Sequence, residues 1–311
     1  MARKVRIEYQ GAIYHVMSRG NRREKICRGD RDRAEFQRAL AEVCARTDWQ
    51  IHAWCIMPNH LHLLVETPRA NLVVGMKWLL GTYTMRFNRR HGLTGHLFAG
   101  RYKALPVDPV EGGYLRTVAD YIHLNPAKAK LLSPEQHLKG YIWSSWPSYL
   151  SPPSSRPPWL RVDRVMGEHG LTHDTLRTRR ELEKRLEHRR KKSDFPREES
   201  GWFLGGRDFR RSLLRKISQK AGAEHYGPEI RESAEEKAEA IICHSLRRLR
   251  LGESQLADMK KGEPRKVAIA LQLKEDTEMS SSWIARRLAM GSRAYVDHLL
   301  WRARKISNNK N

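Results

Sequence analysis

The sequence predicts an α+β protein: a ferredoxin-like antiparallel sheet with helices on one face, followed by an all-α C-terminal domain. Two observations carry this prediction. Over residues 12–107 the hydrophobic period switches between those of strands and helices, in the order β-α-β-β-α-β. From about Ser233 onward the apolar residues have helical spacing. A chain of 311 residues with 40% hydrophobic residues is long enough for two separate cores.

The elements of the first part follow from local patterns. In chain order they are a strand over 12–21, a helix over 30–47, strands over 49–57 and 60–67 that form a hairpin around Pro58-Asn59, a helix over 71–92, and a strand over 96–107. Asp30 is the expected N-cap of the first helix, and Gly92 the C-cap of the second. A further helix over 113–125 should end at Pro126.

The charge of the chain predicts an anionic partner. The formal net charge is +24 and the sequence pI about 10.2. Nucleic acid is the leading partner, because so large an excess of Lys and Arg would repel itself without counter-charge. A membrane partner is not expected: Lys77 interrupts the apolar run Leu72–Leu80, and no stretch is long enough to span a bilayer. Four widely spaced cysteines without a Cys-x-x-Cys pair indicate reduced thiols rather than a zinc cluster.

The stretch WCIMPNHLHLLVE places two histidines on one face of a strand. His60 and His62 are two residues apart, so both point to the face that the two crossover helices leave open, while Leu61 and Leu63 point the other way. Two imidazoles one pleat apart can bind one divalent ion. A pair of solvent-facing histidines is the alternative, and for the pair alone it is the more common case.

The stretch DYIHLNP supplies two further candidates. Tyr121 and Asn125 are four residues apart and share one face of a helix. A tyrosine is a poor nucleophile near neutral pH and would need a metal ion to polarise a phosphodiester. The Asn125 amide oxygen could be a third metal ligand. The alternatives are a buried aromatic residue for Tyr121 and a helix C-cap for Asn125.

The stretch GHLFAGRYKA has the composition of a DNA contact. If it is a strand, Arg101 and Lys103 share a face, where they could bind phosphates, and Phe98 and Tyr102 could stack on bases. An exposed basic edge strand with a core phenylalanine is an equally good interpretation. Arg19 and Asn21, at the end of the first strand, are further candidate DNA contacts.

Four motifs in order, MPNHLHLLVE, GHLFAGRYK, YIHLNPAKA and WSSWPSY, closely resemble those of the REP-associated tyrosine transposases. These are bacterial relatives of the single-tyrosine HUH transposases, named for a histidine–hydrophobic–histidine motif. The resemblance runs from about Tyr9 to Tyr149. It implies that His60, His62 and Asn125 bind Mg or Mn. It also implies that Tyr121 attacks single-stranded DNA beside a hairpin-forming palindrome, which gives a 5′-phosphotyrosine and a free 3′-OH.

The same resemblance implies a bacterial, cytoplasmic and nucleoid-associated protein that works as a monomer or homodimer. His15, on the first strand, could reach the histidine pair, and His123 lies on the tyrosine helix; neither is expected among the metal ligands. Two alternatives to the transposase-like nuclease stay open. One is a catalytically degenerate regulator that binds hairpin DNA, and the other is a replication-type HUH nickase.

The second part begins after a Pro- and Ser-rich stretch over residues 148–160. We expect an HUH nuclease domain over 1–150, a linker and charged helical region over 151–230, and a helical DNA-binding domain over 231–311. The charged helix within 172–192 is either a solvated spacer or a surface that follows DNA phosphates.

The C-terminal stretch SSSWIARRLAMGSRAYVDHLLWRARK resembles a helix-turn-helix and, with its upstream sequence, the DNA-binding domain of DnaA-type initiators. Ser281 or Ser282 should cap its first helix. Its inward residues would be Ile284, Ala285 and Leu288 on the first helix and Val296, Leu299 and Leu300 on the second. Ser292, Arg293, Tyr295 and His298 would be available to double-stranded DNA. A plain helical hairpin with a basic face is the alternative.

Overall fold

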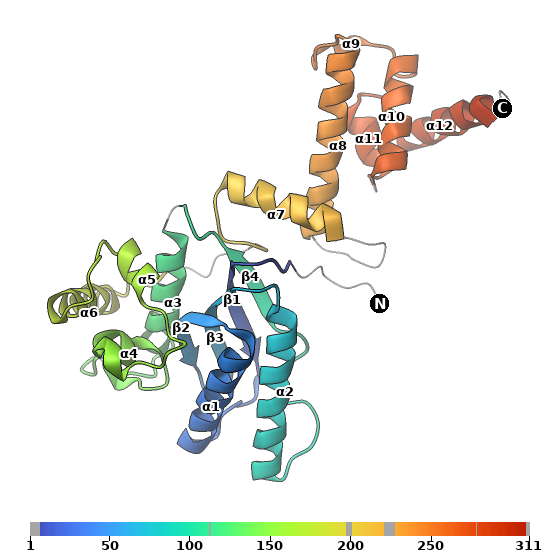
Figure 1. The fold of residues 1–311 in the computed structure, drawn as a ribbon. Helices are drawn as coiled ribbons and strands as arrows, with labels where there is room; N and C mark the ends of the chain where they lie inside the picture. Colours follow the sequence, from blue (N-terminus) through green and yellow to red (C-terminus); the bar gives the residue numbers. More distant parts are fainter. Residues whose placement is uncertain (1–6, 112, 197–200, 221–227, 278, 309–311) are drawn as a thin grey trace. The chain divides into compact units, whose positions relative to one another are not determined.

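Two compact units make up the chain in the computed structural model, which describes residues 7–111, 113–196, 201–220, 228–277 and 279–308. The N-terminal unit extends to Arg210 and the C-terminal unit begins at Arg211, so the boundary falls within helix α7 (Arg207–Lys220). Figure 1 shows the order of the elements along the chain.

A four-stranded antiparallel sheet forms the centre of the N-terminal unit. Its strands are β1 (Ala12–Arg19), β2 (Gln50–Ile56), β3 (His60–Thr67) and β4 (Lys103–Val107). Their spatial order is β2-β3-β1-β4, and every neighbouring pair is antiparallel. The predicted ferredoxin-like arrangement is therefore confirmed.

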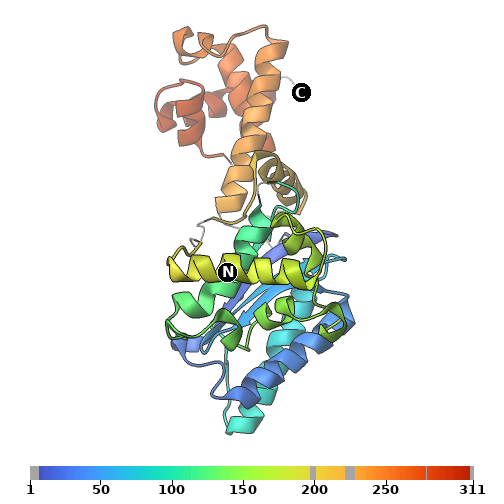
Figure 2. The ribbon, with the colours of Figure 1, turned by 90° about the vertical axis from the view of Figure 1, so that its left-hand side faces the viewer.

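Helices cover both faces of this sheet. The crossover helices α1 (Asp30–Thr47) and α2 (Leu72–His91) lie on one side, and α3 (Tyr114–Lys128) lies on the other (Figures 1 and 2). The first pair matches the prediction of helices on one face. Helix α3 is an additional layer over the face that carries His62, which explains why β3 is buried along most of its length on both sides.

Helix ends agree with the sequence patterns in part. Gly92 ends α2 in the left-handed region, with φ 62°, and donates its N–H to the carbonyl of Asn88, as predicted for a C-cap. Asp30 is instead the first residue of α1, and Gly29 is the N-cap. Pro126 does not end α3, which continues to Lys128.

The strand predicted over 96–107 is only half formed. β4 begins at Lys103, and the chain before it takes positive φ at Gly95 (89°) and Gly100 (54°), which an extended strand cannot contain. Between these glycines the backbone bonds to the end of β1 and the turn after it: the N–H of Ala99 donates to the carbonyl of Arg19.

The segment after α3 closes the outer edge of the sheet. It contains η2 (Leu138–Gly140), α4 (Trp146–Leu150) and η3 (Pro153–Ser155). The backbone N–H of Ile56 donates to the carbonyl of Trp143, and the backbone N–H of Ser145 donates to the carbonyl of Trp54. These bonds satisfy the exposed edge of β2, where an uncovered strand would be open to pairing with another chain.

Residues 151–210 belong to the N-terminal unit, whereas the sequence pattern predicted a linker and charged helical region over 151–230. Helix α5 (Asp163–Glu168) packs against α3, and helix α6 (Leu176–Lys191) packs against α3 and α4. Leu182 and Leu186 of α6 are buried in the same core as the sheet. The Pro- and Ser-rich composition looked like a linker, but the Arg156 guanidinium bonds to the carbonyls of Ser148 and Ser151 and holds this stretch in place.

The C-terminal unit is helical, as predicted. Its further helices are α8 (Pro228–Arg248), α9 (Gln255–Asp258), α10 (Pro264–Asp276), α11 (Ser281–Arg287) and α12 (Arg293–Asn308). A separate core cluster joins α8, α10, α11 and α12. Ser280 caps α11 by accepting from the N–H of Trp283, one residue before the predicted position. Within the described ranges, no helix combines the length and apolar character needed to cross a bilayer.

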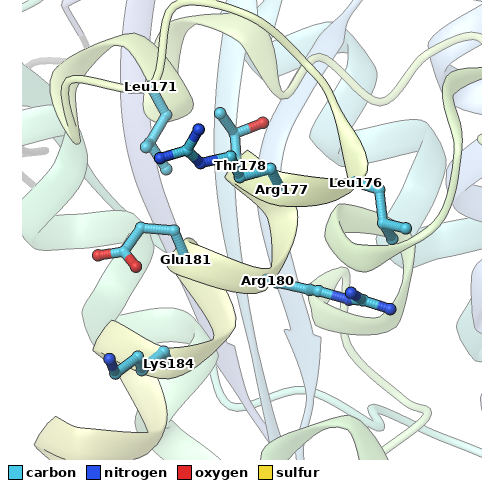
Figure 3. Close-up of a pocket in the computed structure, with 7 residues that line it drawn as sticks. All are labelled: Leu171, Leu176, Arg177, Thr178, Arg180, Glu181 and Lys184. Carbon is cyan, nitrogen blue, oxygen red and sulfur yellow. The ribbon is translucent and has the colours of Figure 1, made fainter.

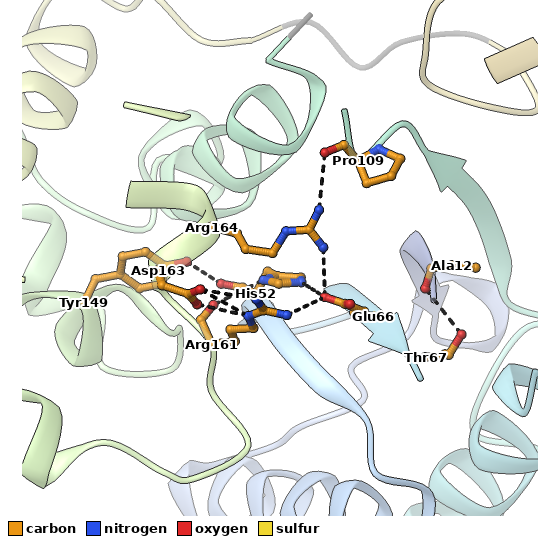
Figure 4. Close-up of polar contacts among 9 residues, drawn as sticks. All are labelled: Ala12, His52, Glu66, Thr67, Pro109, Tyr149, Arg161, Asp163 and Arg164. Atoms are coloured by element: carbon orange, nitrogen blue, oxygen red, sulfur yellow. Dashed lines mark hydrogen bonds and ion pairs between the residues drawn. The ribbon is translucent and has the colours of Figure 1, made fainter. Parts of the chain in front are cut away.

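An ionic network at the end of β3 ties the sheet to the segment after η3 (Figure 4). The Glu66 carboxylate accepts from Nε2 of fully buried His52 at 2.9 Å. Arg164 and Arg161 donate to the same carboxylate at 3.1 and 3.3 Å. The pKa of Glu66 is lowered to about 2, chiefly by the hydrogen bond from His52.

This network should make stability depend on pH. A carboxyl group whose pKa is lowered by folding stabilises the fold fully above its ordinary pKa of 4.5, and loses that contribution as the pH falls through the folded value of about 2. We expect the difference in unfolding free energy between wild type and Glu66→Gln to be constant above about pH 5.5 and to shrink below pH 4.5. Urea unfolding at a series of pH values measures it. A difference that is independent of pH would contradict the assignment.

A second ionic network holds α3 to the α5–α6 layer. The buried carboxylate of Asp120, on α3, accepts from Nη1 of Arg189 at 2.6 Å and from Nε2 of His169 at 3.0 Å. The side chain of His169 is buried at this contact. The other edge of the Arg189 guanidinium binds Asp194, whose side chain is 65% exposed.

The two partners of Arg189 form a matched pair for mutation. We expect Asp120→Ala to lower the free energy of unfolding by about 3 kcal/mol, because it leaves Arg189 and His169 without their buried partner. Asp194→Ala removes a carboxylate from the same arginine, but at an exposed position, and should cost less than about 0.5 kcal/mol. Thermal or urea unfolding compares the two variants. Equal destabilisation would show that Asp120 does not anchor α3.

Candidate active site

The pairing of β1 with β3 places three histidines on one face of the sheet. Met17 lies opposite His62, and Arg19 lies opposite His60. Since paired residues and residues two apart point to the same face, His15 joins His60 and His62 there. Nε2 of His15 lies 3.0 Å from Nδ1 of His62, and the rings of His60 and His62 are 5.0 Å apart between centroids.

Helix α3 brings Tyr121 and Asn125 to this face, as the four-residue spacing predicted. The Tyr121 ring lies 5.4 Å from the ring of His62 and 5.7 Å from that of His15. The Asn125 amide nitrogen lies 3.2 Å from Nε2 of His62. Asn125 is not the C-cap of α3, a position held by Ala129. Tyr121 is 9% exposed, so it is largely buried but not sealed from solvent.

The histidines are neutral at neutral pH. Burial lowers the pKa of His15 to about 3, with a smaller contribution from the charge of Lys103. Burial and the charge of Arg19 lower the pKa of His60 to about 4. The pKa of His62 is also lowered, chiefly by complete burial. A neutral imidazole keeps a lone pair on one ring nitrogen, which is the form that ligates metals.

The hydrogen bonds of the histidine pair fit a divalent ion. Nδ1 of His60 donates to the Asn59 side-chain carbonyl at 2.7 Å, and Nδ1 of His62 is engaged by His15. Both rings are thereby oriented through Nδ1, so Nε2 of each is the nitrogen that would bind the ion. In the parts of the chain that the structure describes, no three His, Cys, Asp or Glu side chains are arranged to hold a metal. An ion here would therefore need the Asn125 amide oxygen, which would take the place of the amide nitrogen that now faces Nε2 of His62.

His15 was expected to be able to reach the histidine pair without being a metal ligand, and the structure places it in contact with His62. The alternation of β1 placed it on the correct face, but its contact with His62 depends on the register between β1 and β3. In the structure His15 orients the His62 ring, because it contacts Nδ1 of His62 while Asn125 lies at Nε2. The ring of His123, by contrast, forms a hydrogen bond with the Ser145 hydroxyl at 2.8 Å.

Three cations border the histidine face. Arg19 pairs with His60 across the strands, and Lys103 pairs with Met17. The third, Lys128, was not predicted: its Nζ lies 5.1 Å from the centroid of the Tyr121 ring. The sequence did contain a signal for this contact: Lys128 follows Tyr121 by seven residues, which places both side chains on the same face of helix α3. Together these cations make the surroundings of Tyr121 favourable for a phosphate.

The other predicted DNA contacts of this unit are partly exposed and partly buried in the core. Asn21 is exposed in the short helix η1 (Asn21–Arg23). Arg101 is exposed but precedes β4, so it does not share a strand face with Lys103 as predicted. Tyr102 is half-buried against the core, and Phe98 is a core residue whose ring lies 6.2 Å from that of Tyr83. The core interpretation of Phe98 is therefore correct.

The C-terminal candidates lie at the start of α12. Ser292, Arg293 and Tyr295 are all exposed there, while Val296 and Leu300 are buried. Positive φ at Ala289 (49°) and Gly291 (91°) forms the turn between α11 and α12. Buried Lys266, on α10, fixes this turn by donating to the carbonyls of Ala289 and Met259 at 3.2 and 3.0 Å.

Comparison with known proteins identifies the region that holds these histidines and Tyr121. Residues 8–125 match the model of a family described as "Transposase IS200 like". One similar solved structure is described as a REP-associated tyrosine transposase bound to a REP hairpin; the match covers 51% of this chain and 91% of that chain, with 17% identity and a TM-score of 0.41. No curated protein matches the chain. The residues that are similar to this family contain all four strands and α3 as far as Asn125.

Proposed function

We propose that the N-terminal unit is a metal-dependent endonuclease and strand transferase that acts on single-stranded DNA beside hairpin-forming palindromes. The observation that carries this proposal is the meeting of Tyr121 and Asn125 with His62 on the histidine face. A buried tyrosine in a purely structural role would not need neutral imidazoles and a side-chain amide around it. The similarity of residues 8–125 to IS200-like transposases supports this reaction class.

The ion in this proposal is Mg or Mn, held by His60, His62 and Asn125. When bound, it would polarise the phosphodiester and stabilise the charge that develops on its oxygens. Two imidazole nitrogens and one amide oxygen are a donor set that suits Mn better than Mg. Arg19 and Lys128, at the border of the site, would hold the flanking phosphates.

Tyr121 would perform the cleavage as a nucleophile. Its phenol oxygen forms a bond to phosphorus and the bond from phosphorus to the 3′-oxygen breaks. The phenol gives up its proton, and the 3′-oxygen gains one and leaves as a 3′-OH. The downstream strand then carries a 5′-phosphotyrosine, and attack by a second 3′-OH reverses the step and joins the strands. Because the phosphodiester energy is stored in the covalent bond, no nucleotide cofactor is required.

The two alternatives differ in chemistry or in substrate. A degenerate regulator that only binds hairpins would have no use for the metal donors beside Tyr121. A replication-type nickase would use the same chemistry, and it differs in its DNA target. All side chains of the candidate site come from one chain. A monomer would therefore contain one complete site, and a homodimer would contain two.

Loss of the nucleophile should separate chemistry from binding. We expect Tyr121→Phe to abolish the SDS-resistant adduct with a labelled DNA hairpin, a reduction of at least about a thousandfold, while its Kd for that hairpin changes less than about twofold. Adduct formation in the wild type should need Mn or Mg and stop with EDTA. Tyr114→Phe, the same change on the same helix, is the control and should keep the adduct. If Tyr121→Phe still forms an adduct, the assignment of the nucleophile is wrong.

We further propose that the C-terminal unit contacts double-stranded DNA through the start of α12. The supporting observations are the exposed side chains of Ser292, Arg293 and Tyr295 on a helix whose opposite face is buried. This is the arrangement by which recognition helices present their first residues to the major groove. It would add affinity for flanking duplex to a site that cleaves single strands.

The contribution of α12 can be measured by duplex binding alone. In the full chain carrying Tyr121→Phe, Arg293→Ala should raise the Kd for duplex DNA about tenfold, because it removes one bond to a base or a phosphate. Arg247→Ala removes another exposed arginine, from α8, and should leave the Kd within about twofold. Equal effects of the two changes would show that α12 has no special part in binding.

A further inference from the structure

Helix α6 carries a row of cations along its outer face. The row consists of Arg177, Arg180, Lys184, His188 and Lys191, spaced three or four residues apart and therefore on one side of the helix. The two arginines and two lysines are all exposed, as is the histidine. At 1.5 Å per residue the row is roughly 21 Å long. In Figure 2 the helix that bears it crosses the near side of the N-terminal unit.

The other charges of α6 are engaged in ion pairs. Its three glutamates bind cations: Glu181 with Arg185, Glu183 with Lys139, and Glu187 with Arg190. Two further arginines of α6 point to carboxylates of neighbouring elements, Arg179 to Asp174 and Arg189 to Asp120. Among the described residues, no carboxylate forms an ion pair with the Arg and Lys side chains of the row. The outer face is therefore an uncompensated line of positive charge.

The first half of the row borders a hollow (Figure 3). Arg177, Arg180 and Lys184 line it together with Leu171 and Leu176, which lie just before and at the start of α6. Glu181 also lines it, but the carboxylate of Glu181 is held by Nε of Arg185 at 2.9 Å. The hollow thus presents three cations that form no ion pair within the described part of the chain, together with two leucine side chains, a surface suited to phosphate oxygens rather than to a cation.

We propose that this row binds the phosphate backbone of double-stranded DNA, the stem of the hairpin that the same unit cleaves. The proposal rests on the proposed function for the identity of the DNA. Duplex is favoured over single strand because the row contains no Phe, Tyr or Trp, whereas surfaces for single strands combine cations with aromatic stacking platforms. A rigid helix instead offers cations at fixed spacing, which suits the regular backbone of a duplex.

The row has a fixed position relative to Tyr121. Arg189, on the inner side of α6, binds Asp120, the residue that precedes Tyr121 on α3. Both helices lie in the N-terminal unit. A stem held along α6 would therefore be held at a constant place relative to the tyrosine, and contacts to phosphates would set the register of the substrate without reading its sequence.

The test removes three charges and measures DNA binding. In the full chain carrying Tyr121→Phe, the variant Arg177→Gln/Arg180→Gln/Lys184→Gln is compared with its parent by fluorescence anisotropy. The probes are a hairpin with a stem of about ten base pairs, one helical turn, and an unpaired oligonucleotide of equal length. Each Kd is measured over a series of salt concentrations, and circular dichroism and the Tm verify that the fold is retained.

A matched control removes the same charges from the other side of the sheet. Arg31→Gln/Lys77→Gln/Arg89→Gln also replaces two arginines and one lysine, all exposed and all on α1 or α2. The control changes the net charge of the chain by the same amount. Any difference between the two triple variants is therefore due to position and not to total charge.

The expected result is specific to the stem. The α6 variant should raise the Kd for the hairpin at least about tenfold and lower the slope of log Kd against log salt by about 2.7, or about 0.9 for each phosphate that is no longer neutralised. Its Kd for the unpaired oligonucleotide should stay within about twofold, and the control should match the parent on both probes. Equal behaviour of variant and control, or equally weakened binding of both probes, would overturn the proposal. Because binding is measured without cleavage, absence of an adduct in the wild type would refute the proposed reaction and leave this result intact.

Discussion

The anchorage of helix α3 is the constraint on which the candidate site depends. Three of its residues, close in sequence, make contacts in three directions. Tyr121 contacts the histidine face, Asp120 binds Arg189 and His169, and His123 bonds to Ser145. Successive residues on a helix are separated by about 100° of rotation, so a turn by one residue would break all three contacts at once. The extra layer after residue 150 therefore fixes the direction of Tyr121 as well as enlarging the core.

The polar face of the sheet is stable because its buried groups are satisfied in pairs. A buried imidazole costs free energy if it is charged or lacks a partner, and here burial keeps all three histidines neutral while His15 and Asn59 engage one nitrogen of each member of the pair. The nearby positive charges act in the same direction on the pKa, because a cation beside an imidazole disfavours its protonation. The same cations favour an approaching phosphate. One arrangement thus holds the imidazoles neutral and attracts a polyanion.

Local patterns in the sequence predicted the parts of the molecule that depend on local physics. The order of strands and helices followed from hydrophobic period, the end of α2 from Gly92, and the shared face of Tyr121 and Asn125 from their spacing. Tertiary contacts decided the rest. The contact of His15 with His62 needs the register of two strands 47 residues apart. The folded conformation of the Pro- and Ser-rich stretch over 148–160 depends on bonds such as those of Arg156, which composition does not reveal.

The many cations of helix α6 are divided between two opposite faces of that helix. Leu182 and Leu186 anchor the inner side, and the arginines on that side are neutralised by Asp120, Asp174 and the glutamates of the helix itself. Folding therefore removes most of the like-charge repulsion within α6, and what remains is concentrated on the side that faces solvent. A helix used only as a spacer would need no such division, because ion pairs on all sides would serve it equally. The segregation of paired from unpaired cations, rather than the net charge, is what marks the outer face of α6 as a binding surface.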